Sequence, residues 1–160
     1  MMRLSLALVA LACCAGTLAA QQHPESAEQG EHALRASQVP AAVRDAFRRA
    51  YPHATVRGYT TETENGRTIF EVESREGALG RDVSYGADGT VLEVEETVPV
   101  AQLPPAVRSA ITAQAGTATI RRSERNVTGS DTTYEFAIHG RRGEIRLRAD
   151  GTSLPPESNE

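Results

Sequence analysis

Two groups of charged residues have the types and the spacing to bind a partner. Carboxylates recur at alternate positions in the middle of the chain, and arginines gather near its end. A surface of one charge sign attracts and selects a partner of the opposite sign. We therefore take both groups as candidate partner-binding faces: Glu71, Glu73, Asp82, Glu93 and Glu95 in the first, and Arg141, Arg142, Arg146 and Arg148 in the second.

Residues arranged for catalysis are missing from the sequence. The four histidines, His23, His32, His53 and His139, have no second ligand at HxxxH or HxH spacing, so no metal site is expected. A carboxylate pair for acid–base chemistry needs a cleft that shifts its pKa, whereas these carboxylates follow strands expected to be exposed. No glycine-rich phosphate loop opens a helix, and no serine motif resembles a nucleophile elbow. We predict a protein that is not an enzyme and holds no metal or cofactor.

The elements that carry these residues occur twice, because the second half of the chain repeats the first. At an offset of 64, the segment VPAAVR at 39–44 recurs as LPPAVR at 103–108. Apolar positions stay apolar, and Ala87–Thr90 returns without change as Ala149–Thr152. This agreement indicates an internal duplication.

Each copy is expected to be one helix followed by an antiparallel meander. Apolar residues at i, i+3, i+4 and i+7 follow Pro40 and Pro104, which fit the start of a helix. Asn-Gly and Asp-Gly are strong hairpin signals, because both residues tolerate a positive φ. The predicted fold class is α+β, a tandem repeat of a helix packed on an antiparallel three- to four-stranded meander. In the first copy the expected strands are 56–63, 67–74, 82–85 and 91–96, separated by Asn65–Gly66, Gly77–Gly80 and Asp88–Gly89.

Period-two alternation separates a buried face from an open face in each expected meander. One helix covers one side of a sheet, so the charged alternate positions are left on the other side. A module of about 60 residues is marginally stable alone, so we expect the copies to pack together or to share a sheet. The residues expected to face the helices are Phe70, Val72, Val83, Tyr85, Leu92 and Val94 in the first copy, and Tyr134, Phe136, Ile138, Ile145 and Leu147 in the second.

The two copies carry opposite net charge. Residues 37–97 contain 7 arginines and 11 acidic residues, a net charge of −4, and residues 98–156 contain 8 arginines and 5 acidic residues, a net charge of +3. The faces could be ordinary solvated surfaces, they could select a partner, or opposite halves of two molecules could attract each other. The net charge of −4 for the whole chain argues against general binding to nucleic acid.

The first residues have the layout of a secretory signal peptide. A positive start at Arg3 precedes a mostly apolar run at 4–12, which is too short to span a bilayer. The only cysteines, Cys13 and Cys14, lie inside this leader, so cleavage after Ala19 leaves no thiol. A lipid anchor at Cys13 or Cys14 is the alternative, but the match to a lipobox is imperfect and we favour plain cleavage. The expected boundaries are 1–19 signal peptide, 20–36 flexible tether, 37–98 first repeat, 99–156 second repeat and 157–160 tail.

With these motifs in place, the chain resembles the PepSY-like family, in the tandem form related to the beta-lactamase-inhibitory-protein fold. The resemblance covers nearly everything after the tether. It implies a small exported domain that binds or inhibits secreted or envelope proteins, and it lends no catalytic residue. Inhibition of beta-lactamase is not carried over, because the outward positions here are mostly charged rather than aromatic. The matching residues are Val39–Val43, Tyr51–Pro52, Phe70–Val72 and Asp88–Thr90, and again Leu103 through Thr152.

These observations favour an exported, non-catalytic binding module in the periplasm or outside the cell. Its expected partner is an envelope or secreted protein, which it inhibits or chaperones through its open sheet faces. Nucleic acid is not an expected partner, and no transmembrane span is expected. The alternative is a periplasmic sensor of a cation or small ligand on the acidic face, although calcium needs six or more converging oxygen ligands.

Overall fold

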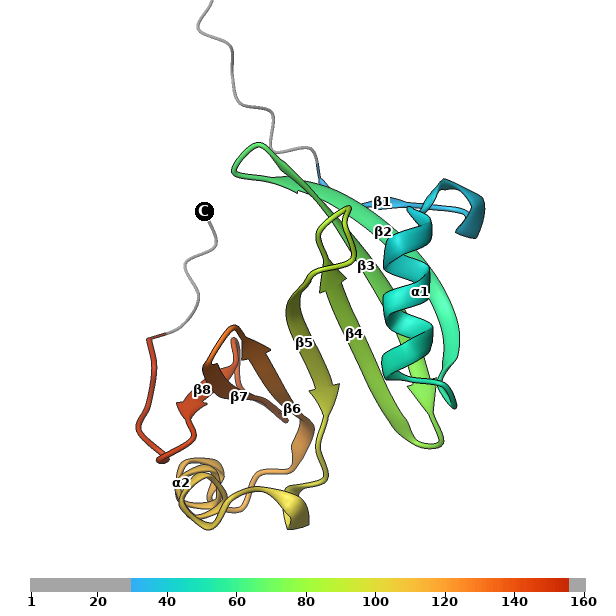
Figure 1. Ribbon diagram of the computed structural model, residues 1–160. Helices are drawn as coiled ribbons and strands as arrows, with labels where there is room; N and C mark the ends of the chain where they lie inside the picture. Colours follow the sequence, from blue (N-terminus) through green and yellow to red (C-terminus); the bar gives the residue numbers. More distant parts are fainter. Residues whose placement is uncertain (1–29, 156–160) are drawn as a thin grey trace, which may run out of the picture.

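A computed structural model describes residues 30–155, which form one antiparallel sheet with two helices against it (Figure 1). The expected signal peptide, both cysteines, most of the expected tether and the expected tail lie outside these residues. The eight strands follow one another in the sheet in chain order. The elements are β1 (His32–Ala33), η1 (Ala36–Gln38), α1 (Ala41–Ala50), β2 (Thr55–Glu64), β3 (Arg67–Glu76), β4 (Leu79–Tyr85), β5 (Val91–Thr97), η2 (Val100–Gln102), α2 (Pro105–Ala115), β6 (Ile120–Thr128), β7 (Asp131–Ile138) and β8 (Ile145–Arg148).

Each helix begins directly after a proline, close to where the sequence places it. Pro40 is the N-cap of α1 and Pro104 is the N-cap of α2. Pro52 follows the end of α1 and cannot continue a helix, because it lacks a backbone N–H. α2 ends at Gly116, whose φ of +59° carries little steric cost in a residue without a Cβ. Local sequence signals therefore set both ends of both helices.

Two hydrophobic cores lie between the helices and the sheet. Burying one Val, Leu, Ile or Phe side chain stabilises the fold by about 1.5–3 kcal/mol, so each core is a main source of stability for its half. The first core contains Val39, Val43, Phe47, Val72, Val83 and Tyr85. The second contains Leu103, Val107, Ile111, Tyr134, Phe136, Ile138, Ile145 and Leu147.

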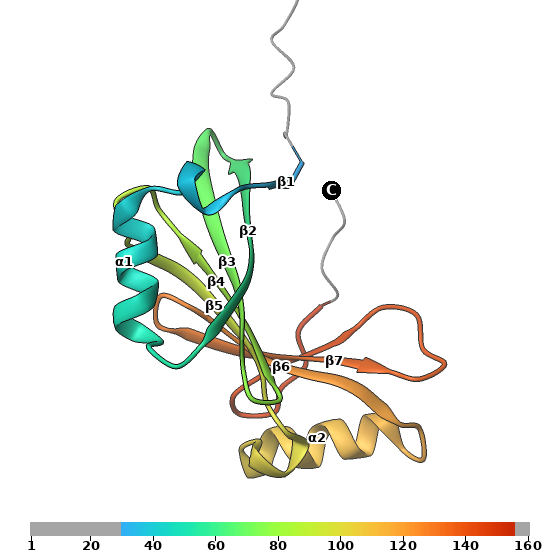
Figure 2. The same cartoon turned by 90° about the vertical axis from the view of Figure 1, so that its right-hand side faces the viewer.

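Both helices cover the same face of the sheet. Residues paired directly across antiparallel strands point to the same side, and one row of such pairs crosses five strands. It begins under α1 and ends on β7 beside Tyr134 and Phe136, which pack under α2. The opposite face is therefore open across both halves, and it is strongly twisted, because β6 and β7 run at a steep angle to β2–β4 (Figure 2). The row is Val72, Val83, Val94, Val127 and Thr132.

Leu92 departs from the expected buried pattern. Ser84 pairs with Glu93 and Tyr85 pairs with Val91, so Leu92 is the extra residue of a β-bulge. A bulge interrupts the alternation of side chains along a strand. Leu92 is absent from the first core and lines a depression of about 490 Å³ on the open face instead. The expectation that it faces the helix was wrong, because period two assumes an unbroken ladder.

Residues 30–36, expected to belong to the flexible tether, contain ordered elements. His32 pairs with Thr61 and Ala33 pairs with Thr60, so β1 forms the edge of the sheet. Leu34 packs against the first core. The folded part therefore begins before residue 37. The sequence did not predict this start, because a two-residue strand leaves no periodic signal.

A group of ion pairs joins the two halves on the helix-covered face. Arg81 Nε of β4 donates to Glu96 Oε2 of β5 at 3.2 Å, and Arg125 of β6 donates to the other oxygen of Glu96. The Arg81 guanidinium also lies 4.2 Å from the centre of the Tyr51 ring. The side chains of Arg81 and Glu96 are only 12% and 20% exposed, so water screens their attraction weakly.

Candidate binding face

The open face of the sheet gathers the acidic residues that the sequence analysis selected. All five belong to two parallel rows of directly paired residues. The central row runs from acidic side chains on β3–β5 to an arginine on β8. It consists of Glu73, Asp82, Glu95, Asn126, Thr133 and Arg148. The adjoining row consists of Glu71, Ser84, Glu93, Thr128 and Asp131.

Glu71 lies at the acidic end of this face among other carboxylates. Burial, followed by the charges of Asp82, Glu31, Glu73 and Glu62, raises the pKa of Glu71 to about 7. Burial and the charge of Glu73 also raise the pKa of Asp82. These acidic groups repel one another when they are ionised, and Arg57 and Arg75 line the depression beside Glu73 and Asp82.

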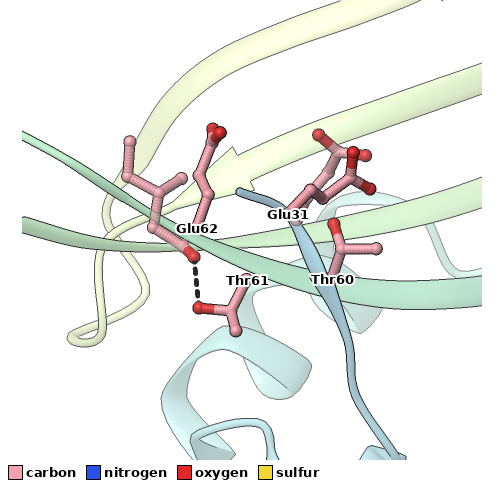
Figure 3. Close-up of a pocket in the computed structure, with 6 residues that line it drawn as sticks. Glu31, Thr60, Thr61 and Glu62 are labelled. Atoms are coloured by element: carbon pink, nitrogen blue, oxygen red, sulfur yellow. Dashed lines mark hydrogen bonds between the residues drawn. The ribbon is translucent and has the colours of Figure 1, made fainter. Parts of the chain in front are cut away.

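A small cavity of about 80 Å³ lies beside Glu71 at the edge of the sheet. Figure 3 shows Glu31, Thr60 and Glu62 lining this cavity from β2 and from the segment before β1. Thr61 points the other way, and its hydroxyl donates to the carbonyl oxygen of Ile69 at 2.8 Å. The acidic surface therefore continues from β3 to the edge of the sheet.

Glu95 of β5 and Glu124 of β6 share a side-chain hydrogen bond where the two halves of the sheet meet. Burial, the charge of Glu124 and this hydrogen bond raise the pKa of Glu95 to about 7. Two carboxyl groups can form a hydrogen bond only when one of them carries a proton. Arg122 Nε lies 3.0 Å from Glu124 Oε2 and balances the charge of that carboxylate. Burial also raises the pKa of Glu124, so the two carboxyl groups share a proton near neutral pH.

The basic residues that the sequence analysis selected do not form one surface. Arg148 ends the central row, and Arg146 lies on the same strand. Arg146 Nε donates to Glu135 Oε1 at 2.8 Å, so its charge is already paired within the chain. Arg141 and Arg142 lie in the loop between β7 and β8 and are exposed. The structure thus assembles the acidic set and separates the arginines.

Solved structures with the same arrangement come from Bacteroides species. A BLIP-like protein from Bacteroides fragilis superimposes with a TM-score of 0.58 at 18% identity, over 74% of this chain and 85% of that chain. The chain has a BLIP-like fold. A protein from Bacteroides eggerthii, whose name places it in the periplasm, gives a TM-score of 0.61 at 14% identity, over 74% of this chain and 88% of that one.

A DUF2874 family protein from Bacteroides ovatus shares the BLIP-like fold as well, with a TM-score of 0.58 at 13% identity, over 74% of this chain and 86% of that one. At such identities the similarity shows the fold alone. No family model matches this chain, and no curated protein matches it. The PepSY-like resemblance therefore stays a prediction, whereas the BLIP-like fold of this chain is confirmed.

Two further acidic residues of the BLIP-like sheet were not selected from the sequence. Glu124 and Glu135 pair directly across β6 and β7, and each is only 9% exposed. Both contact arginines, Arg122 and Arg146 respectively. Glu135 stood at an alternate position in the expected second meander. Glu124 could be placed beside Glu95 only once β5 was seen to pair with β6.

The carboxylates of the open face do not converge on one point. Within residues 30–155, no group of three or more His, Asp or Glu side chains is placed to hold a metal ion. Neighbouring strands are about 4.8 Å apart, so side chains from successive strands spread along the rows. In the same part of the chain, no helix is long and apolar enough to cross a membrane.

Proposed function

We propose that this chain is an exported, non-catalytic binding module whose open sheet face binds a basic surface of an envelope or secreted protein. The observation that supports this proposal is the central row of Glu73, Asp82 and Glu95, with Glu71 beside it. Burial, followed by like charges, raises the pKa of Glu71, Asp82 and Glu95. An arginine or lysine from a partner would remove this repulsion, so docking of a basic surface is favourable.

The same face offers an apolar contact for the partner. Ile69 and Leu92 line the depression of about 490 Å³ together with Glu93 and Thr128. Protein interfaces commonly combine an apolar centre with a polar rim. The partner surface that fits is therefore an apolar side chain flanked by basic ones.

We also propose that the two halves are copies of one helix-plus-meander unit, which together present the open face. Gly89 and Gly151 support this proposal, because they occupy the same place in each half. A Cβ on Gly89 would lie 2.7 Å from the carbonyl oxygen of Ala42 in α1, and a Cβ on Gly151 would lie 2.8 Å from that of Ala106 in α2. In each half, the loop that contains this glycine thus packs against the first turn of the helix.

The predicted signal peptide and the periplasmic name of the Bacteroides eggerthii protein support a location in the periplasm or outside the cell. The BLIP-like fold supports protein binding as the class of activity. Inhibition and chaperoning both remain proposals within that class. Beta-lactamase is not proposed as the target, since the charged open face differs from an aromatic inhibitor surface.

A matched pair of charge reversals tests the proposed face. Glu73→Arg changes an exposed residue of the central row, and Asp45→Arg makes the same charge change on α1, where Asp45 is half-exposed and pairs with Arg48. Full-length wild-type chain and both variants are immobilised and exposed to envelope extract. We expect wild type and Asp45→Arg to retain a basic protein that salt elutes, and Glu73→Arg to lose it. Equal capture by both variants would place binding elsewhere on the molecule.

A further inference from the structure

A groove lies where β5 leaves the sheet. β5 ends at Thr97, where the chain at 98–100 turns away toward η2. The neighbouring strands β4 and β6 run antiparallel to β5, and their N-terminal ends extend beyond Thr97. Val98 N–H still donates to Ser123 O at 2.9 Å, after which the two segments separate. The space left between the β3–β4 hairpin and the start of β6 has a volume of about 400 Å³. This volume is within the range of about 300–1,000 Å³ that small ligands occupy.

One wall of the groove is apolar and firmly held. Val98, Val100 and Ile120 line the groove and also pack against the second core. Pro99 lies between the two valines and restricts the backbone there. An apolar group entering the groove would therefore meet a preformed surface and displace water from it.

The other wall carries arginines, one of which is unpaired. Arg122 is engaged with Glu124 and Glu144, and Arg75 donates to the carbonyl oxygen of Ala78 at 3.2 Å. Arg121 lines the same groove and is exposed. Among residues 30–155, no side chain forms an ion pair or a hydrogen bond with Arg121. Its guanidinium is free to bind an acid.

A buried hydroxyl also lines the groove. Ser123 is only 6% exposed, and its Oγ has no hydrogen-bond partner among the described residues. Ser123 pairs with Phe136 and its hydroxyl is enclosed by protein atoms, so it forms part of the wall without offering a donor to a ligand. Glu124 is the acidic residue of the lining, and its charge is balanced by Arg122 at 3.0 Å. An anionic ligand is therefore not repelled by an unpaired carboxylate.

We propose that this groove binds a carboxylate attached to a short apolar body. Arg121 binds the carboxylate, and Val98, Val100 and Ile120 contact the apolar body. A short fatty acid and the apolar C-terminal residue of a polypeptide both have this chemistry. The groove is separate from the acidic rows of the open face, so the inference is independent of the proposed protein-binding function.

Calorimetric titration of the full-length chain tests the groove with two probes. The first is octanoate, compared with the neutral 1-octanol. The second is the peptide N-acetyl-Ala-Val-Leu with a free C-terminus, compared with its C-terminal amide. We expect at least one acid to bind at a single site and its neutral counterpart to bind about tenfold more weakly, the loss expected for a charge-assisted contact. Binding of octanoate alone would identify a fatty acid, and binding of the peptide alone would identify a polypeptide end.

Variants then locate the site. Arg121→Gln should weaken binding of the acid about tenfold and leave the neutral compound unchanged. Arg49→Gln removes an exposed arginine from α1 and should change nothing. The proposal is overturned if neither acid binds, if the neutral compounds bind equally well, or if Arg121→Gln binds like wild type.

Discussion

Glu95 of β5 hydrogen-bonds Glu124 of β6, so a pair of carboxyl groups holding one proton lies where the two halves of the sheet meet. On the opposite face, Glu96 joins Arg81 and Arg125 across the same strands. Neighbouring residues of β5 therefore connect the two halves in different ways. One connection depends on a proton, and the other depends on opposite charges.

The proton at Glu95 makes stability depend on pH. The pKa values of Glu71 and Glu95 are raised from 4.5 to about 7 in the folded chain. Between pH 4.5 and 7 the folded chain therefore binds more protons than the unfolded chain, so stability falls as pH rises through that window. Allowing for solvent screening, each carboxyl contributes about 1 kcal/mol. We expect the Tm to be about 5 °C lower at pH 8 than at pH 5, as measured by circular dichroism.

Glu95→Gln should remove part of that dependence. The amide donates a hydrogen bond to Glu124 at every pH and carries no charge. We expect the variant to match wild type near pH 5 and to be about 1 kcal/mol more stable at pH 8, measured by urea unfolding. Glu64→Gln, at the exposed end of β2, is the control and should leave the pH profile unchanged. A variant with the wild-type pH profile would show that the shared proton has no effect on folding.

Glu96→Gln should destabilise the junction at every pH between 6 and 9. The change leaves Arg81, whose side chain is 12% exposed, without its main counter-charge. Removing one partner of a buried ion pair costs about 3–5 kcal/mol, and we expect about 2 kcal/mol here because Arg125 is more exposed. Urea unfolding at pH 8 measures the effect. Glu64→Gln, exposed at the end of β2, should change the midpoint very little.

Gly89→Ala and Gly151→Ala should have equally large effects. The φ angles of the two glycines are +83° and +85°, and a Cβ at either position would lie under 3 Å from a helix carbonyl oxygen. Strain from φ and from this clash should each contribute, for a total of about 2–4 kcal/mol per variant.

Gly77→Ala is the control for these two variants. Gly77 also has a positive φ, of +62°, but nothing lies within 4 Å of a Cβ built there. Only the backbone strain remains, so we expect a loss of about 1 kcal/mol. Thermal unfolding of all three variants tests the comparison. A mild effect at Gly151 beside a large one at Gly89 would contradict the proposed equivalence of the two halves.

Millimolar calcium should leave the Tm unchanged to within about 1 °C. The acidic side chains spread along two rows of the sheet rather than around a point, and a ligand stabilises a protein only when it binds the folded state. Magnesium at the same concentration controls for ionic strength. A rise of several degrees with calcium alone would support the cation-sensor alternative instead.

The sequence by itself determined where the helices and turns lie and how buried and open positions alternate along the strands. Pro40 and Pro104 located the helices, Asn65–Gly66 located a hairpin, and alternate positions separated valines from carboxylates. These signals work because helix ends, turns and side-chain direction depend on residues close together in the chain. The equal turns at Gly89 and Gly151 were visible for the same reason.

Only the tertiary structure decided which strands pair and which side chains meet across them. The pairing of β5 with β6 placed Glu124 beside Glu95 and set both helices on one face, and the bulge at Leu92 turned an expected core residue outward. Strand register depends on contacts between residues distant in sequence, and a shift of one residue reverses every side chain. Local periodicity carries no information about that choice, so the shared proton and the groove beside Arg121 became visible only in the folded chain.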